Sequence, residues 1–157
     1  MMINIRKATA TDMYGVHRMV QELADYTQLS EEVETNPEMF IRDGFGERAL
    51  FECFVAETPQ DGIVGIAFFY FGYSTWKGKN LYLEDLVITD AYRRQGIGKM
   101  FFDALVAYAR NQKVQEIRWH VLDWNEPAIK FYQKMNASLD PNWMTCKLAA
   151  NKLEMYQ

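Results

Sequence analysis

The order of elements between residues 81 and 122 constrains the fold more than any other feature of the sequence. LYLEDLVIT, at 81–89, predicts a strand, apolar residues at helical spacing cover 97–111, and QEIRWHVL, at 115–122, predicts a second strand. Two strands separated by a connection of this length are expected to run parallel, with a right-handed crossover. The fold therefore contains a sheet that is covered by a helix.

The residues before this unit predict antiparallel strands. INIRKA, at 3–8, alternates apolar and polar residues, and the β-rich runs 50–57 and 63–74 are joined by TPQDG. The proline and the Asp-Gly pair in that connection favour a hairpin turn. We therefore expect an α/β fold, or α+β by a stricter convention, with a mixed central sheet flanked by helices.

Three further helices are predicted. Thr9 or Thr11 can cap a first helix, whose apolar residues recur at helical spacing. Asn36 precedes a proline and opens a short helix that should end near Asp43, because two glycines follow. The pattern at 127–135 indicates a last helix.

Composition indicates one globular domain over residues 1–157. Of these residues 49% are hydrophobic and 24% charged, and no repeat or linker divides the chain. The C-terminal stretch 142–157 predicts two short strands.

The longest apolar run, IVGIAFFYFGY, is too short to span a bilayer, and the N-terminus carries no secretory signal. The net charge of −4 argues against a nucleic-acid partner, so we expect neither nucleic acid nor membrane as a partner.

The cysteines and histidines indicate no metal site. Cys53 and Cys146 lie far apart and form no CxxC motif, which favours free thiols in a reducing compartment and a cytoplasmic protein. His17 and His120 are isolated from each other in the sequence. Two such histidines do not make a metal site, and we expect none.

A glycine pair lies between the strand at 81–89 and the helix at 97–111. A dinucleotide-binding fingerprint would need a third glycine at Phe101, and a P-loop would need glycine at Arg93 and Ser or Thr at Met100. Both motifs fail. The spacing that remains is Arg-x-x-Gly-x-Gly, which can still hold a phosphate, because glycines admit an anion and the helix N-terminus offers unpaired N–H groups. The alternative is a tight turn without a ligand.

The ordered set of motifs resembles the GNAT superfamily of acetyl-CoA-dependent N-acetyltransferases. LYLEDLVITDAYRRQGIGK, WNEPAIKFYQKMNAS and RDGFGE are similar to the diamine (spermidine/spermine) and thialysine acetyltransferase branch. The resemblance covers nearly the whole chain. It implies a GNAT fold, acetyl-CoA as co-substrate, a small cationic amine as acetyl acceptor, and a homodimer.

The resemblance also implies where acetyl-CoA binds. Main-chain groups late in the strand at 81–89 should bond the pantetheine arm, the glycine loop should hold the pyrophosphate, and residues just beyond the next strand should contact the other side. These residues are Leu86, Val87, Ile88, Arg93, Arg94, Gln95, Gly96, Ile97, Gly98, Lys99, Asn125, Glu126, Pro127 and Ala128.

Two residues carry the expected chemistry. Tyr132 matches the family tyrosine that protonates the leaving thiolate, although its helical spacing alone would favour an ordinary core aromatic. Glu84 is assigned to substrate binding and to proton removal through water, and Asp85 to a supporting role. Strand alternation places these two carboxylates on opposite faces unless a bulge turns one of them.

The resemblance places further amine-binding residues in the loop after the first helix, at Tyr26, Thr27, Glu31 and Glu32. A solvated charge pair is the alternative for the two glutamates. The branch has an acidic residue where Thr27 stands, and an acidic residue and proline where Ser74 and Thr75 stand. These departures favour a short diamine or the side-chain amine of lysine, thialysine or ornithine. The remaining alternatives are a protein lysine or N-terminal acetyltransferase and a non-catalytic coenzyme A-binding module.

Overall fold

The computed structural model describes residues 2–157, in two compact units that divide between His120 and Val121. The expectation of one domain over the whole chain stays a prediction. The first unit contains, in chain order, β1 (Asn4–Lys7), α1 (Met13–Tyr26), α2 (Pro37–Phe45), β2 (Glu52–Thr58), β3 (Gly62–Ser74), β4 (Gly78–Ile88), α3 (Ile97–Asn111) and β5 (Glu116–Arg118). The second unit contains α4 (Glu126–Lys134) and α5 (Ala150–Met155).

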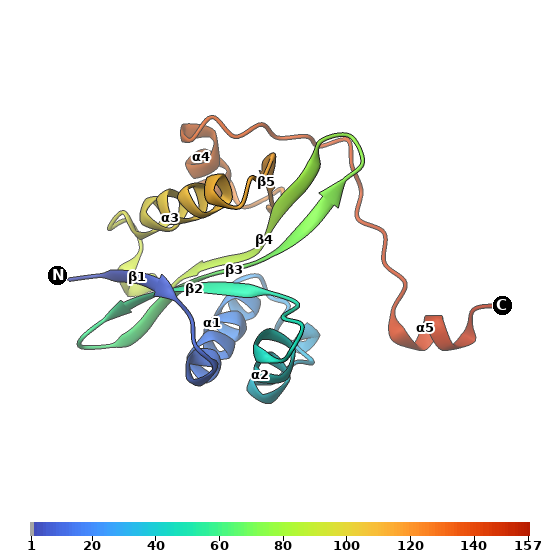
Figure 1. Ribbon diagram of the computed structural model, residues 1–157, viewed down its shortest axis with the longest axis horizontal. Coiled ribbons are helices and arrows are strands. Elements are labelled where there is room, and N and C mark those ends of the chain that lie inside the picture. The colour runs from blue at the N-terminus through green and yellow to red at the C-terminus, as the bar shows by residue number, and fades with distance from the viewer. Residues whose placement is uncertain (1) are drawn as a thin grey trace. The chain divides into compact units, whose positions relative to one another are not determined.

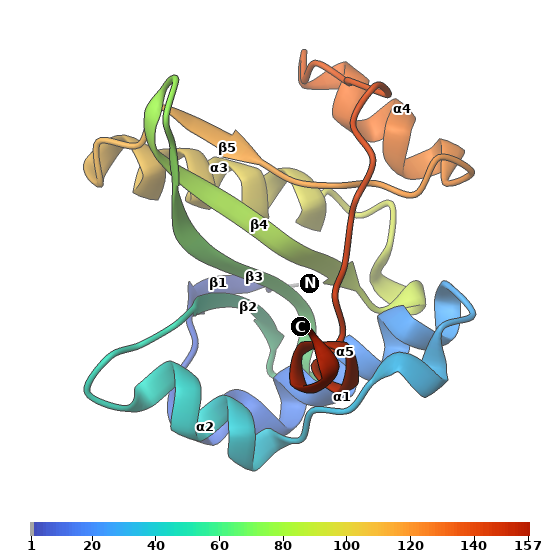
Figure 2. The same cartoon turned by 90° about the vertical axis from the view of Figure 1, so that its right-hand side faces the viewer.

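The sheet of the first unit is mixed, as predicted. Its strand order is β1-β2-β3-β4-β5, with antiparallel pairing from β1 to β4 and a parallel pair formed by β4 and β5. Helices α1 and α2 lie on one face of the sheet and α3 lies on the other (Figures 1 and 2). Helix α3 has the bounds that the sequence predicts.

Strand β5 is shorter than the predicted strand at 115–122. Only Glu116–Arg118 form it, and they pair with Asn80–Tyr82 of β4. The prediction was wrong for Gln115 and for residues 119–122. The pairing of β5 with β4 ends at Tyr82, just before the extra residue that shifts the register of β4 against β3. Trp119 instead packs edge-on against Phe102 of α3, with ring centroids 5.3 Å apart.

Only the start of α2 follows its predicted cap. Thr9 caps a 3₁₀ turn, Ala10–Asp12, and α1 begins after it at Met13; α4 begins and ends one residue earlier than predicted. The Asn36 side chain accepts a hydrogen bond from the Met39 N–H at 2.9 Å, which begins α2. This helix continues through Gly44 to Phe45, two residues past the predicted end. The N-terminus of α4 has the same kind of cap: Asn125 accepts from the Ala128 N–H at 3.4 Å.

The two strands predicted at 142–157 are wrong. That segment contains α5 and otherwise no regular structure. The reason is that a strand needs a neighbouring strand, whereas alanine, lysine, leucine, glutamate and methionine favour a helix through local interactions alone. Every residue from Ser138 onward in this unit is exposed.

Each face of the sheet has its own apolar core. On the α1/α2 face the buried cluster includes, among others, Met13, Val16 and Met19 of α1, Val55 of β2, Ile66 of β3 and Val87 of β4. On the α3 face Tyr108 contacts the rings of Phe54, Phe69 and Phe71 at centroid distances of 5.6–6.1 Å. Between Ile66 and Phe71, alternation along β3 therefore directs even-numbered side chains toward α1 and α2, and odd-numbered ones toward α3.

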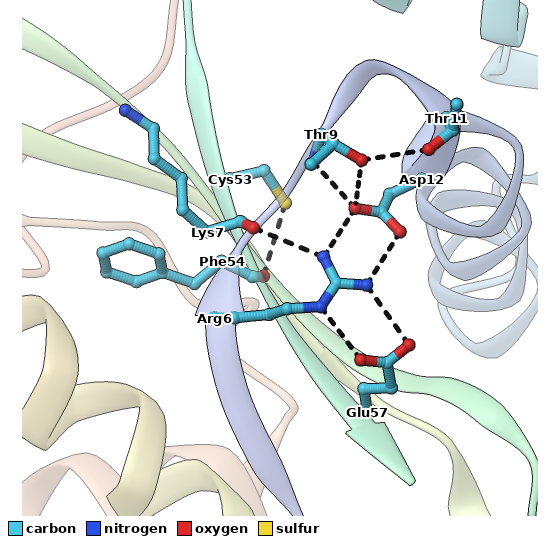
Figure 3. A network of polar contacts seen from close by, with 8 residues as sticks. All are labelled: Arg6, Lys7, Thr9, Thr11, Asp12, Cys53, Phe54 and Glu57. Carbon is cyan, nitrogen blue, oxygen red and sulfur yellow. Dashed lines mark hydrogen bonds and ion pairs between the residues drawn. The ribbon is translucent and has the colours of Figure 1, made fainter. Parts of the chain in front are cut away.

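An ion-pair network joins β1, β2 and the start of α1 (Figure 3). The Arg6 guanidinium donates two hydrogen bonds to Asp12, at 2.7 and 3.0 Å, and two to Glu57, at 2.9 and 3.2 Å. Asp12 also accepts from the Thr9 N–H at 2.7 Å. The hydrogen bonds from Arg6 hold the pKa of Asp12 at about 2, below its usual 3.8.

Replacing Asp12 by asparagine should lower the free energy of unfolding at pH 7 by about 1–2 kcal/mol. Because the pKa of Asp12 falls on folding, its contribution is complete above the unfolded value and is lost as the pH falls toward 2. The stability gap between D12N and the wild type should therefore shrink between pH 4 and pH 2 in urea titrations. The exposed Asp123 is the matched control, and D123N should leave the curve unchanged.

Candidate functional site

A β-bulge in β4 organises the site. Phe69 of β3 is paired with Leu83, and the preceding residue, Phe68, is paired with Asp85. Glu84 is therefore an extra residue with no partner on β3, and two residues of β4 oppose one step of β3.

The bulge places both carboxylates on the same face of the sheet. Asp85 is paired with Phe68, whose ring packs on the α1/α2 face against Phe40. Glu84 lies on that face too, because it accepts a hydrogen bond from the Tyr70 hydroxyl at 3.4 Å, and Tyr70 points to the same side as Phe68. Of the two arrangements left open by the sequence, the structure has the one with a bulge.

The environment of Asp85 raises its pKa to about 6. The main cause is burial, which disfavours the charged form, and the second is the neighbouring charge of Glu84. Among residues 2–157, no salt bridge within 4.0 Å involves either carboxylate. An acidic pair in which Glu84 is exposed and Asp85 is half-buried, without a cationic partner, attracts a cation and can accept a proton near neutral pH.

Aromatic side chains lie beside the acidic pair. The rings of Tyr70 and Tyr82 are 5.2 Å apart, and the Tyr82 hydroxyl is 2.7 Å from Nδ1 of His120. Burial and the charge of Glu84 raise the pKa of both tyrosines. Sequence reasoning missed Tyr70 and Tyr82, because aromatic residues in strands usually indicate core. The spacing of Tyr82 and Glu84, two residues apart on one strand, was the available signal.

The edge of β4 that faces β5 is open beyond Tyr82. Since β5 pairs only with Asn80–Tyr82, the stretch 83–88 has no strand neighbour on that side within the described residues. The predicted cofactor contacts Leu86, Val87 and Ile88 lie on this stretch. The Ile88 carbonyl already accepts a hydrogen bond from Nε of Arg93 at 3.0 Å. An extended ligand can bond the remaining main-chain groups as a further strand would.

Two features of the loop before α3 suit an anion: its left-handed residues and the N–H groups at the start of the helix. Arg94 and Gly96 both have left-handed backbones, with φ of 62° and 83°. Left-handed residues that alternate with ordinary ones turn successive N–H groups toward one point, which binds anions. The first bond into the helix runs from the Met100 N–H to the Gly96 carbonyl at 3.1 Å. The N–H groups of residues 97–99 therefore have no acceptor within α3.

The cations of this loop have different surroundings. Arg93 donates to Ile88 and Asp90, and its guanidinium lies 4.8 Å from the ring centroid of Tyr26. It thus links the loop to the end of α1. Arg94 is exposed, and Lys99 is an exposed residue that pairs with Asp103 one turn along α3. The Gln95 side chain donates to the Ala91 carbonyl at 3.0 Å. Arg94 and Lys99 are therefore the cations best able to reach an anion.

The predicted amine-binding loop lies at the end of α1. The Thr27 hydroxyl donates to the carbonyls of Leu23 and Ala24, which completes the last turn of this helix. Glu31 and Glu32 are exposed in a single 3₁₀ turn, Ser30–Glu32. They line a hollow of about 390 Å³ together with Gln28, Leu29 and Ser30. Neither carboxylate of β4 lines this hollow.

The remaining predicted residues belong to the second unit. Tyr132 lies in α4, is 9% exposed, and its ring tilts against Phe131 with centroids 5.5 Å apart. Burial raises the pKa of Tyr132 to about 12, so its hydroxyl keeps its proton at neutral pH. Asn125 and Pro127 begin α4, with Glu126 in its first turn and Ala128 as the donor to the cap. Their predicted contacts with the cofactor stay predictions.

Comparison with known proteins identifies the family. Residues 16–137 match the model of the acetyltransferase (GNAT) family. The chain is 39% identical over 142 residues to thialysine N-epsilon-acetyltransferase of Bos taurus, covering 86% of this chain and 84% of that protein. It is 35% identical over 139 residues to spermidine/spermine N(1)-acetyltransferase-like protein 1 of Homo sapiens, covering 85% of this chain and 20% of that protein.

A solved structure supports the same fold. The tetramutant of the BH1408 protein from Bacillus halodurans superposes with a TM-score of 0.76 at 25% identity, over 92% of this chain and 99% of that one. The loop at 94–99 offers the unbonded N–H groups at the start of α3 and the exposed cations Arg94 and Lys99, which is the chemistry that a diphosphate such as that of coenzyme A needs. The fold, the branch and the co-substrate inferred from the sequence are thereby confirmed. The chain belongs to the GNAT family and is an acetyl-CoA-dependent acetyltransferase.

Proposed function

We propose that the protein acetylates the primary amine of a small cationic molecule: a diamine or polyamine, or a lysine-, thialysine- or ornithine-like side chain. The observation that carries this proposal is the pair Glu84 and Asp85, which the bulge brings to one face beside an open strand edge. The unpaired negative charge suits an ammonium group. The names of the bovine and human relatives support the same substrate class.

The acidic pair would bind the ammonium group and then remove its proton. An alkylammonium has a pKa near ~10, so it must lose a proton before its nitrogen can attack. In the proposed mechanism Glu84 takes that proton through a water molecule. Asp85, a neighbouring carboxylate of raised pKa, has a supporting role in this proton removal. When bound, acetyl-CoA supplies a thioester carbonyl that the neutral nitrogen attacks, which breaks the C–S bond.

Tyr132 would supply the proton that the departing thiolate needs. Its raised pKa keeps the hydroxyl protonated at neutral pH, which a general acid requires. The proposed binding residues for the thioester are the main-chain groups of Leu86–Ile88, the loop Arg93–Lys99 and the residues Asn125–Ala128. Tyr26, Thr27, Glu31 and Glu32 are proposed to contact the far end of the amine.

Acetyl transfer to a substrate panel tests this function. We expect release of free thiol from acetyl-CoA with thialysine, lysine, ornithine, 1,3-diaminopropane or spermidine, and slower release with a lysine-containing peptide. Tyr132→Phe should lower kcat by about 10²–10⁴-fold, because one acid–base group contributes about that much. Preference for the peptide would favour a protein acetyltransferase. Tight coenzyme A binding without turnover would indicate a binding module.

The two carboxylates should give different pH profiles. We expect Glu84→Gln to lower kcat strongly at pH 7 and less at pH 9, where more of the amine is already neutral. Since the pKa of Asp85 is about 6, activity of the wild type should fall below that pH, and Asp85→Asn should remove this acidic limb. An effect of E84Q that does not change with pH would reject the base role.

Asp85→Asn should also stabilise the fold at neutral pH. The pKa of Asp85 rises on folding, so stability is highest while the group is protonated and is lost as the pH rises through about 6. D85N should therefore have a higher free energy of unfolding than the wild type at pH 7, by about 1–3 kcal/mol, with little difference at pH 4. Urea titrations at the two pH values measure this. A variant that is more stable but less active would show that the carboxylate serves function rather than folding.

We also propose that the protein is a homodimer in the cytoplasm. The exposed C-terminal residues Trp143, Met144 and Tyr156 support an interface, since each exposes at least 75% of its surface. Light scattering should give twice the mass of one chain, and Trp143→Asp should shift the protein toward monomer.

Two free cysteines support a reducing compartment. No helix of residues 2–157 is long and apolar enough to cross a bilayer.

A further inference from the structure

The hydroxyl of Tyr82 lies among acidic groups but makes its short hydrogen bond elsewhere. Its oxygen is 2.7 Å from Nδ1 of His120, a residue just beyond β5. The rings of the two residues meet edge to face, with centroids 5.7 Å apart. The Tyr82 hydroxyl is therefore hydrogen-bonded to the His120 imidazole, and the ring contact holds the two side chains together.

The Glu84 carboxylate is a second possible acceptor for the Tyr82 hydroxyl. It precedes Glu84 by two residues on the same face of β4, and the charge of Glu84 contributes to its raised pKa. The neighbouring Tyr70, whose ring lies beside that of Tyr82, donates its own hydroxyl to Glu84. A tyrosine hydroxyl without another acceptor would be drawn to the carboxylate, because bonds to charged acceptors are the stronger ones.

The direction of the Tyr82–His120 hydrogen bond determines whether the Tyr82 hydroxyl can also donate to the Glu84 carboxylate. A neutral imidazole with its proton on Nε2 accepts at Nδ1, and Tyr82 is then the donor. In that arrangement the hydroxyl proton points away from Glu84. A carboxylate has about four acceptor sites. A site that accepts no hydrogen bond from the protein can accept one from a ligand.

We propose that His120 is a positioning residue for amine recognition: it accepts the Tyr82 hydroxyl at Nδ1 and so keeps this second donor off the Glu84 carboxylate, whose acceptor sites not used by Tyr70 stay open to the substrate ammonium. The inference rests on the proposed function, since it assigns His120 and Tyr82 to the same amine site. It makes specificity for cationic amines depend on a residue that touches neither the amine nor acetyl-CoA.

A double-mutant cycle measured with thialysine tests this role. His120→Leu removes the acceptor, so Tyr82 should turn to Glu84 and raise the KM for thialysine by about 3- to 10-fold, the effect of one hydrogen bond. The values of kcat and of the KM for acetyl-CoA should change less than twofold. His120→Asn keeps an acceptor at the δ position and should stay close to the wild type. In the Tyr82→Phe background, His120→Leu should have no further effect.

A merely structural His120 predicts a different result, because the loss would then persist in Tyr82→Phe and appear in every kinetic constant. Tyr73→Phe is the control, since it removes the hydroxyl of an exposed tyrosine on β3. Nitrogen NMR of the imidazole gives a readout besides activity: the neutral ring should carry its proton on Nε2, and a proton on Nδ1 would overturn the proposal. If His120→Leu turns over thialysine with an unchanged KM, the proposed role of His120 is overturned, while the proposed function stands. Absence of turnover with every amine would overturn the proposed function as well.

Discussion

One inserted residue in β4 determines the geometry on which the site depends. Without Glu84 as a bulge, alternation would bury one carboxylate against α3 and leave the other on the α1/α2 face. With it, both lie on one face. The ladder between β4 and β5 also stops just before the bulge, at Tyr82, and the main-chain edge from residue 83 to residue 88 is left open. The acidic pair and the open edge are thus neighbours along one strand.

This arrangement works against folding, and the rest of the first unit compensates for it. The half-buried carboxylate of Asp85, next to the charge of the exposed Glu84 and without a cation, disfavours the folded state at neutral pH, because burial and that charge both raise its pKa. Around the bulge, β3 remains paired with β4 on both sides, and the aromatic contacts of Tyr108 hold the opposite face of the sheet. A local cost of this kind is expected where a site, rather than the core, selects the residues.

The sequence was sufficient for most helices and strands of the first unit and insufficient for the local geometry. Helix α3 and the antiparallel strands follow from periodicity and turn residues, which act locally. The bulge could be named only as an alternative, since the sequence does not show which residue lacks a partner. The left-handed backbone of Arg94 carries no signal, because arginine disfavours it and only its context imposes it. The C-terminal stretch was misjudged because apolar residues suggested strands where no strand partner exists among the described residues.

Two departures from the branch pattern have local structural roles, and these bear on the substrate. The Thr27 hydroxyl donates to two carbonyls at the end of α1. The Ser74 hydroxyl accepts from the N–H groups of Trp76 and Lys77 and so shapes the turn after β3. Neither position carries a charge that could hold a second ammonium group. Glu31 and Glu32 are exposed, so water and salt screen their charges. Strong electrostatic recognition is then concentrated at Glu84 and Asp85, which favours an amine recognised mainly at its reacting end. A substrate such as thialysine or a short diamine meets that condition better than a long polyamine, whose distal charges would gain little from this surface.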